Sequence, residues 1–285
     1  MITVPGLPAI LYEHIIRHAL REDLGRAGDL TSDAIVPAGR IAGAVIVARN
    51  DGRIAGTEVA SSVFRILDGS MDVRALVADG DGVGAGDEMI RIRGAAREIF
   101  AGERTALNLL GHMCGIASLT HAYVQAVKGT SARIVCTRKT TPGLRVLEKY
   151  AVRCGGGANH RFGLDDAVLI KDNHVAIAGS VRSAVEQARL AAGHMVKVEL
   201  EVDNLEQLAD GLGVGIDAVL LDNMDTVTLR SAVGLVDGRC VTEASGGICL
   251  ENVAEVAATG VDLLSVGAIT HSAPSIDVSL EFEAG

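Results

Sequence analysis

The chain has 285 residues and a formal net charge of −10, with 48% hydrophobic and 22% charged residues. This length allows one large domain or two of ordinary size, and the apolar fraction supplies a sizeable core, which excludes a mainly disordered chain. The chain has no Trp and few Tyr or Phe residues, so base stacking on aromatic side chains, and with it nucleic-acid binding, is not expected.

The first hundred residues mix helical and strand-like patterns. Residues 10–25 are amphipathic with a helical period and end at a glycine, which predicts a helix. Residues 41–56 hold two short apolar runs around Asn50-Asp51-Gly52, which predicts a β-hairpin. Residues 73–94 repeat this theme with Gly-Asp turns. We therefore predict a first domain of α+β type, mostly antiparallel.

A different pattern begins at Glu103. A long helix is predicted there, which Gly111 and Gly115 weaken or bend. Short apolar strands then alternate with amphipathic helices. The predicted strands are residues 133–136, 167–170, 196–200, 218–221, 239–242 and 263–266. The predicted helices are residues 142–154, 180–192, 205–212, 225–236 and 250–259.

Strands that alternate with helices imply a parallel sheet with right-handed crossovers. The strand spacing fits the units of an α/β barrel. Because six strands fall short of eight, we predict an incomplete barrel. A doubly wound sheet is the alternative, although no GxGxxG motif follows an early strand.

The cysteines and the N-terminus indicate a cytoplasmic protein. The five cysteines are widely spaced with no CxxC pair, which favours buried, reduced thiols over disulfides or zinc ligands. The N-terminus lacks a basic segment followed by a long apolar run. No stretch approaches eighteen uninterrupted apolar residues, so no membrane span is expected.

Polar or charged residues follow nearly every predicted strand. In parallel α/β folds the carboxyl ends of the strands form the rim of the active site. The residues concerned are Thr137–Thr140, Lys171–His174, Glu201, Asp222–Asn223, Glu243–Gly247 and Gly267–Ala268. The sequence therefore predicts one functional face, with cations early in the chain and with carboxylates and glycine turns later.

Cations are concentrated between Arg138 and Lys171, against the acidic balance of the whole chain. Such a local excess indicates a pocket for a small polyanion. Three further cations, Arg145, Lys149 and Arg153, recur at helical spacing, and we expect them on a solvated helix face.

Two segments of this cationic stretch carry open alternatives. Gly155-Gly156-Gly157 ends a helix, or lets the backbone approach a ligand closely, with His160 and Arg161 as donors. Lys171 is either a Schiff-base lysine or a clamp for an anion.

Glu201 and Asp222 end consecutive strands, and Glu199 shares the side-chain direction of Glu201. These carboxylates either share a Mg²⁺ ion with ligand phosphates and water, or pair with a pocket Lys or Arg. Ser245-Gly246-Gly247 and Val266-Gly267-Ala268 have the pattern of phosphate-binding turns, because their backbone N–H groups can converge on an anion.

Several motifs resemble the quinolinate phosphoribosyltransferase family, also called nicotinate-nucleotide pyrophosphorylases. They are the ERTALNLL helix and the runs TRKTTPGLRVLEKYAVRCGGGANHRFGLDDAVLIKDNH, ELEVDNLEQL, DAVLLDNM, EASGGI and VDLLSVGAITHS. The resemblance covers most of the chain.

The resemblance implies a pentosyltransferase of NAD biosynthesis. Quinolinate and phosphoribosyl pyrophosphate would give nicotinate mononucleotide, pyrophosphate and CO2, with Mg²⁺ as cofactor. It also implies a homodimer, an N-terminal α+β sandwich domain over residues 1–108, on which the tail 273–285 packs, and an incomplete TIM-like barrel over residues 109–272.

The resemblance also assigns roles to single residues. Arg138, His160, Arg161 and Lys171 match residues that hold the quinolinate carboxylates, and Arg104 matches an arginine that reaches the partner subunit's site. Lys139, Glu201 and Asp222 match residues around phosphoribosyl pyrophosphate and the metal, and with Lys171 they form the predicted catalytic set. The predicted phosphate contacts are Ser245, Gly246, Gly247, Val266, Gly267, Ala268 and His271.

The chain departs from the family pattern at two positions. Cys136 stands where the family usually has Asp, and Ala158 stands where a larger polar or basic residue is common. Paralogues of molybdenum-uptake type share several motifs, so another acceptor is one alternative function. A Schiff-base lyase that uses Lys171 and a non-catalytic phosphate-sugar sensor are the others.

Overall fold

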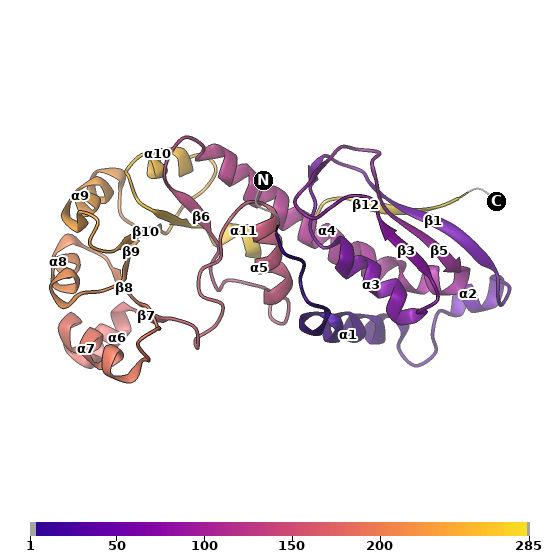
Figure 1. The fold of residues 1–285 in the computed structure, drawn as a ribbon, viewed down its shortest axis with the longest axis horizontal. Coiled ribbons are helices and arrows are strands. Elements are labelled where there is room, and N and C mark those ends of the chain that lie inside the picture. The colour runs from indigo at the N-terminus through magenta and orange to yellow at the C-terminus, as the bar shows by residue number, and fades with distance from the viewer. Residues whose placement is uncertain (1–3, 284–285) are drawn as a thin grey trace. The chain divides into compact units, whose positions relative to one another are not determined.

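A computed structural model describes residues 4–283 (Figure 1). They group into two compact units. The sandwich unit holds the chain up to His121, residues 140–156 and the chain from Thr270 onward. The barrel unit holds residues 122–139 and 157–269. The predicted domain boundary between residues 108 and 109 stays a prediction.

The sandwich unit is built on a four-stranded antiparallel sheet with the order β12-β1-β5-β3. Its strands are β1 (Ile41–Ala48), β3 (Asp72–Ala75), β5 (Glu88–Ala95) and β12 (Val278–Phe282). Strand β12, close to the end of the chain, pairs with β1. Ile46, Ile90 and Ile92 are fully buried, as expected where alternate side chains of a strand face the core. The prediction of an antiparallel α+β part is confirmed.

Helices cover this sheet. The amphipathic helix α1 (Glu13–Leu24) confirms the first predicted helix, and it packs on α3 (Thr57–Leu67), which contacts β3 and β5. The smaller elements of the unit are η1 (Ala9–Leu11), α2 (Leu30–Ile35), β2 (Gly52–Arg53) and β4 (Gly82–Val83).

The predicted hairpin around Asn50-Asp51-Gly52 is wrong. Strand β1 pairs with β5 and β12, whereas β2 pairs with β4 in a separate two-stranded sheet. Gly52 serves close packing, because a Cβ there would lie 2.1 Å from the Cδ1 atom of Ile276. A glycine that packs against the side chain of Ile276 therefore resembled a turn signal.

The long helix α4 (Ala96–Ala126) begins earlier than predicted and runs unbroken past both of its inner glycines. The backbone N–H of Ile276 donates a 3.0 Å hydrogen bond to the carbonyl oxygen of Gly111. A Cβ on Gly115 would lie 2.1 Å from the carbonyl oxygen of Pro274. The two glycines thus let the C-terminal segment lie directly against the helix.

The barrel unit contains one sheet of six parallel strands, in the order β6-β11-β10-β9-β8-β7. The strands are β6 (Arg133–Val135), β7 (Val168–Ile170), β8 (Val198–Val202), β9 (Ala218–Asp222), β10 (Val241–Ser245) and β11 (Leu263–Ser265). All six predicted strands are confirmed. Among the described residues β6 and β7 form the two edges and do not pair with each other, so the barrel is incomplete, as predicted.

Helices lie on the outer side of this curved sheet (Figure 1). They are α7 (Val181–Ala191), α8 (Leu205–Val214), α9 (Thr226–Val236) and α10 (Val253–Ala257). The sequence missed α6 (Asp172–Ala178) and α11 (Ala268–His271). No helix within residues 4–283 combines the length and the apolar character needed to span a bilayer.

Helix α5 (Arg145–Cys154) belongs to the sandwich unit and corrects one prediction. Lys149 is 1% exposed and Glu148 is fully buried, so the prediction of a solvated position is wrong for Lys149. Arg145 is half-buried, and Arg153 is exposed as predicted. The Glu148 carboxylate accepts hydrogen bonds from the backbone N–H of Thr141 and from His112 Nε2. Helical spacing alone did not reveal these partners.

None of the five cysteines, all of which lie within residues 4–283, forms a disulfide, as predicted. Cys114, Cys136 and Cys154 are buried, whereas Cys240 and Cys249 are half-exposed, so the prediction of burial is wrong for the last two. Burial raises the pKa of the Cys114 thiol to about 12, which keeps it protonated and unreactive.

The packing of α4 generates a stability prediction. Gly115→Ala places a methyl group on the backbone of Pro274, so we expect a loss of about 1–3 kcal/mol of stability. Gly213→Ala in α8 is the matched control, because nothing lies within 4 Å of its added Cβ. Thermal unfolding measures both variants, and equal unfolding midpoints would contradict the packing role of Gly115.

Candidate functional site

The carboxyl ends of the six parallel strands open into one cleft of about 630 Å³ in the barrel unit. Each strand contributes residues at or just after its end, and so does the segment before β7. The lining residues are Thr137, Arg138, Lys139, His160, Arg161, Leu169, Lys171, Glu201, Leu220, Asp222, Asn223, Glu243, Ser245, Gly246, Gly247 and Ser265. The common edge expected for the strand ends therefore exists.

Most of the predicted site residues meet in this cleft. Those brought together are Arg138, Lys139, His160, Arg161, Lys171, Glu201, Asp222, Ser245, Gly246 and Gly247. Those that do not line it are Arg104, Val266, Gly267, Ala268 and His271.

The second predicted phosphate turn differs from expectation. The backbone N–H of Val266 donates to the carbonyl oxygen of Val135 on β6, so it is not available to an anion. Ser265, one residue earlier, lines the cleft instead. His271 is exposed, and its Nδ1 atom lies 2.6 Å from the hydroxyl of Ser272. Arg104 lies on the exposed side of α4 in the sandwich unit.

Arg161 and Arg138 place two positive charges close together. Burial lowers the pKa of the Arg161 guanidinium, and the nearby charge of Arg138 lowers it further. The side chain of Arg161 is fixed in position by a hydrogen bond that its Nη1 atom donates to the carbonyl oxygen of Ala167. The charges of Glu199 and Asp166 act in the opposite direction on the Arg161 pKa. Since a guanidinium stays charged at every pH that proteins meet, an anion bound between the two side chains would relieve the remaining repulsion.

The segment before β7 carries His160 and Arg161 along the edge of β6. The Ala158 N–H donates to the carbonyl oxygen of Ile134, and the Cys136 N–H donates to the carbonyl oxygen of Ala158. The Cys136 thiol also lies 3.4 Å from Asn159 Oδ1. These contacts extend the sheet by one bridge, so both departures from the family pattern lie beside the cationic pair.

The role of the glycine triplet is partly corrected. A Cβ on Gly155 would lie 2.4 Å from the carbonyl oxygen of Ala117, so this glycine serves the packing of α5 on α4. Gly156 has a φ of 91°, in the left-handed region that favours glycine, and turns the chain after the helix.

Lys171 forms an ion pair across neighbouring strand ends. Its Nζ atom lies 2.5 Å from Glu201 Oε2, and the two side chains are 46% and 15% exposed. Schiff-base lysines are activated by a dry apolar pocket or by a neighbouring cation. A half-exposed lysine on a carboxylate suits anion binding better.

Helix α6 begins directly after Lys171. The His174 ring accepts a hydrogen bond from the Lys171 N–H through Nδ1, and the His174 N–H donates to the Lys171 carbonyl oxygen. A histidine three residues beyond a strand end was the available signal for this helix start.

The β9 and β10 ends form a strained pair of turns. Asn223 has a φ of 53°, which is unusual for a residue other than glycine. Its side chain donates to Asp222 Oδ2 at 2.7 Å. A Cβ on Gly246 would lie 2.1 Å from Asn223 Oδ1, so Gly246 is required for this arrangement. Such strain is concentrated at functional sites.

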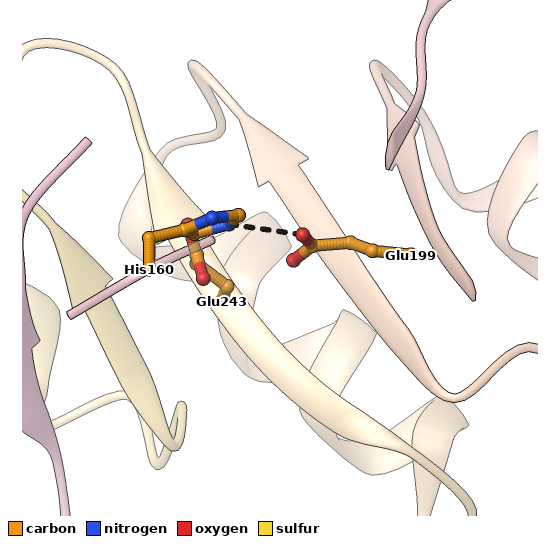
Figure 2. A group of neighbouring side chains, drawn as sticks. All are labelled: His160, Glu199 and Glu243. Carbon is orange, nitrogen blue, oxygen red and sulfur yellow. Dashed lines mark ion pairs between the residues drawn. The ribbon is translucent and has the colours of Figure 1, made fainter. Parts of the chain in front are cut away.

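Glu201 and Asp222 offer the hard oxygen ligands that Mg²⁺ prefers. The one group of three potential metal-ligating side chains within residues 4–283 is a different set, formed by His160, Glu199 and Glu243 (Figure 2). Glu201 pairs with Lys171, which is the alternative that the sequence left open, and Asp222 accepts a hydrogen bond from Asn223. A magnesium ion at Glu201 and Asp222 would need ligand phosphates and water to complete its coordination.

Glu199 and Glu243 meet at His160 (Figure 2). His160 Nε2 lies 3.0 Å from Glu199 Oε2 and 3.5 Å from Glu243 Oε1. Burial, and next the charge of Glu199, raise the pKa of Glu243. Glu199 thus does not join Glu201. Glu243 was predicted on the functional face, but no role was assigned to it and its pairing with His160 was not predicted. A glutamate inside a buried parallel strand was the signal for that role.

Two family models match the chain. "Quinolinate phosphoribosyl transferase, N-terminal domain" matches residues 29–114, and "Quinolinate phosphoribosyl transferase, C-terminal domain" matches residues 116–281.

Individual relatives agree with the family models. The nicotinate-nucleotide pyrophosphorylase [carboxylating] of Mycobacterium leprae is 48% identical over 93% of this chain and 95% of its own length. A probable enzyme of the same name from Bacillus subtilis is 42% identical over 94% and 92%. The crystal structure of NadC from Streptococcus pyogenes has a TM-score of 0.94 and 38% identity, over 98% of this chain and 100% of that one. The chain belongs to the quinolinate phosphoribosyltransferase family.

Proposed function

We propose that this chain transfers the phosphoribosyl group of phosphoribosyl pyrophosphate to quinolinate and releases nicotinate mononucleotide, pyrophosphate and CO2. The relatives' shared name describes the same reaction in the opposite direction. One observation carries the proposal: four cations and three carboxyl groups converge on a single cleft in a chain of net charge −10. Both substrates are small, compact anions, which such a cleft attracts.

The acceptor half of the cleft contains Arg138, Arg161 and Lys171, with His160 beside them. Quinolinate carries two adjacent carboxylates. Guanidinium groups bind carboxylates through paired hydrogen bonds, and a lysine adds a point charge. The crowding of Arg138 and Arg161 favours a doubly charged acceptor over a singly charged one.

The donor half contains Lys139, the Ser245–Gly247 turn, Glu201 and Asp222. Gly246 and Gly247 have φ values of 90° and 61°, so this turn can present its backbone to a phosphate. We place the donor's phosphates there, with Lys139 on the leaving pyrophosphate. Of the other predicted donor contacts, Val266 has its N–H committed to β6, and Gly267, Ala268 and His271 lie outside the cleft lining.

Magnesium is the cofactor in this proposal, held by Glu201 and Asp222 together with the donor's phosphates and water. When bound, it neutralises negative charge on the pyrophosphate. The side chains of the cleft perform the remaining tasks of binding and orientation.

The roles of the two carboxylates follow from the charges that develop on the donor during the reaction. As the bond between the ribose and pyrophosphate breaks, its electron pair leaves with pyrophosphate, and positive charge grows on the ribose. Glu201 and Asp222 stabilise that charge. The pyridine nitrogen then donates its lone pair to the anomeric carbon.

Loss of CO2 completes the reaction. The quaternary nitrogen withdraws electrons from the adjacent ring carbon, so its carboxylate leaves as CO2. The bonding pair stays on the ring carbon, which then takes up a proton. No covalent bond to the enzyme forms at any stage.

A direct assay tests this function. Purified protein with Mg²⁺, phosphoribosyl pyrophosphate and quinolinate should give nicotinate mononucleotide and CO2 in equal amounts. Nicotinate in place of quinolinate should give little product, because it has one carboxylate for two arginines. Removal of Mg²⁺ with a chelator should stop turnover, and added Mg²⁺ should restore it. Product without CO2, or full activity without the metal, would refute the corresponding part.

The lysines of the cleft generate a second prediction. Lys139→Ala and Lys171→Ala should each lower kcat/KM by about 100-fold or more, because each removes a charge from the bound anions. Lys197→Ala is the matched control, since Lys197 precedes β8 and pairs with Asp217 near the opposite end of the sheet. Steady-state kinetics compare the three variants, and full activity in either cleft variant removes that lysine from the mechanism.

We also propose a homodimer in which Arg104 completes the partner's site. The exposure of Arg104 on α4 and its absence from the cleft lining support this role. Mixing inactive Arg104→Ala protein with inactive Lys171→Ala protein should then restore up to about a quarter of the wild-type activity, because half of the mixed dimers' sites are intact. No recovery after verified subunit exchange would refute the shared site.

No feature of the structure favours the alternative functions. The surroundings of Lys171 do not suit a Schiff base, and the names of the relatives do not favour an acceptor of the molybdenum-uptake type. We infer a cytoplasmic location, which the free state of all five cysteines supports.

A further inference from the structure

His160, Glu199 and Glu243 form a cluster of neighbouring side chains (Figure 2), of which His160 and Glu243 line the cleft. Glu199 from β8 is 8% exposed, and Glu243 from β10 is 1% exposed. Both carboxylates point at the same ring nitrogen of His160, at 3.0 Å and 3.5 Å. The charge of this cluster depends on which of the two glutamates and the imidazole carry protons.

The other ring nitrogen identifies the tautomer of His160. The backbone N–H of Arg161 donates a 2.7 Å hydrogen bond to Nδ1. An Nδ1 atom that accepts a hydrogen bond carries no proton, so the proton of the neutral ring is on Nε2 and is directed at Glu199. A metal ion on Nε2 would need the lone pair at that position, so the cluster is not a metal site.

Glu243 holds the second proton of the cluster. Its Oε1 atom is buried and has no hydrogen-bond partner within residues 4–283. Burial and the facing carboxylate of Glu199 on β8 raise the pKa of Glu243, and they outweigh the lowering effects of His160 and of the Ser265 hydroxyl on β11. The neighbouring residue on β9 is the apolar Leu220. A buried carboxylate charge without sufficient compensation raises the free energy of the folded state, and protonation of Glu243 removes that charge.

We propose that Glu199 and Glu243 are positioning residues for the acceptor: Glu199 fixes the Nε2–H form of His160, and Glu243 lies beside it as a neutral acid. The inference rests on the proposed acceptor role of Arg161. His160 Nδ1 anchors the Arg161 amide, so the orientation of the ring is coupled to that guanidinium. A neutral Glu243 also removes one buried negative charge beneath a doubly charged acceptor.

The proposal predicts a selective effect on the acceptor. Glu199→Leu, which removes the partner of Nε2–H, should raise the KM for quinolinate roughly tenfold or more, while the KM for phosphoribosyl pyrophosphate changes by less than about twofold. Glu199→Gln keeps an accepting oxygen and should recover part of the loss. The control is Glu206→Gln, an exposed glutamate on α8, with unchanged kinetics.

Glu243→Gln tests the proton directly, because an amide mimics the neutral acid and cannot ionise. A carboxyl group with a raised pKa is neutral at low pH and becomes charged as the pH rises. The KM of the wild type for quinolinate should therefore rise between about pH 6 and pH 8, and this rise should be absent in Glu243→Gln.

Nitrogen NMR of protein with ¹⁵N-labelled histidine gives a readout that does not depend on activity. His160, assigned by its absence in His160→Asn, should show a bare Nδ1 and a protonated Nε2 at every pH from about 6 to 8.5. A doubly protonated ring, the opposite tautomer, an equal rise of both KM values in Glu199→Leu, or an unchanged pH rise in Glu243→Gln would each overturn the proposal. Failure of the wild type to convert quinolinate would instead refute the proposed function.

Discussion

Repulsion between cations at the carboxyl edge of the parallel sheet is the constraint on which the site depends. Arg161 is partly buried beside Arg138, and both burial and that neighbour lower its pKa. A folded chain retains two neighbouring cations only if other contacts hold the side chains in place or negative charge compensates their positive charge. The contact of Arg161 with the Ala167 carbonyl does the first, the charges of Glu199 and Asp166 offset part of the repulsion, and the proposed dianionic acceptor would offset the rest. The cleft is therefore prepared for its ligand before the ligand arrives.

The period of two along β8 assigns its two glutamates to different tasks. Glu199 and Glu201 point to the same side of the sheet, two residues apart. Glu201 reaches the rim and pairs with Lys171, whereas Glu199 lies deeper and pairs with His160. Strand β8 thus contributes one glutamate to the solvent-accessible rim of the cleft and another to the buried contact with His160. The depth difference explains why two residues of the same type do not act as one metal site.

Prediction from sequence succeeded where one local signal was sufficient. The strands of a parallel sheet are short apolar runs because helices cover them, and their polar ends mark the functional edge. All six strands and most of the cleft's lining residues followed from that pattern, whereas His160 and Arg161 were predicted from the cationic stretch and the family motifs. It failed where a residue's partner is distant in sequence. Gly52 imitated a turn because Ile276 packs on it, and Lys149 has helical spacing typical of a solvated face yet is buried in the sandwich unit.

The amino-acid order by itself determined the alternation of strands and helices, the cationic stretch and the family motifs, because these depend on neighbours within a few residues. Only the tertiary structure decided which carboxylate pairs with which cation. It also decided that the Val266 N–H donates to the carbonyl oxygen of Val135 on β6, and that Glu243 lies against His160. The physical reason is that hydrogen bonds and charge pairs act over a few ångströms. They join residues such as His160 and Glu243, which chain spacing does not relate and which the curvature of the sheet brings together.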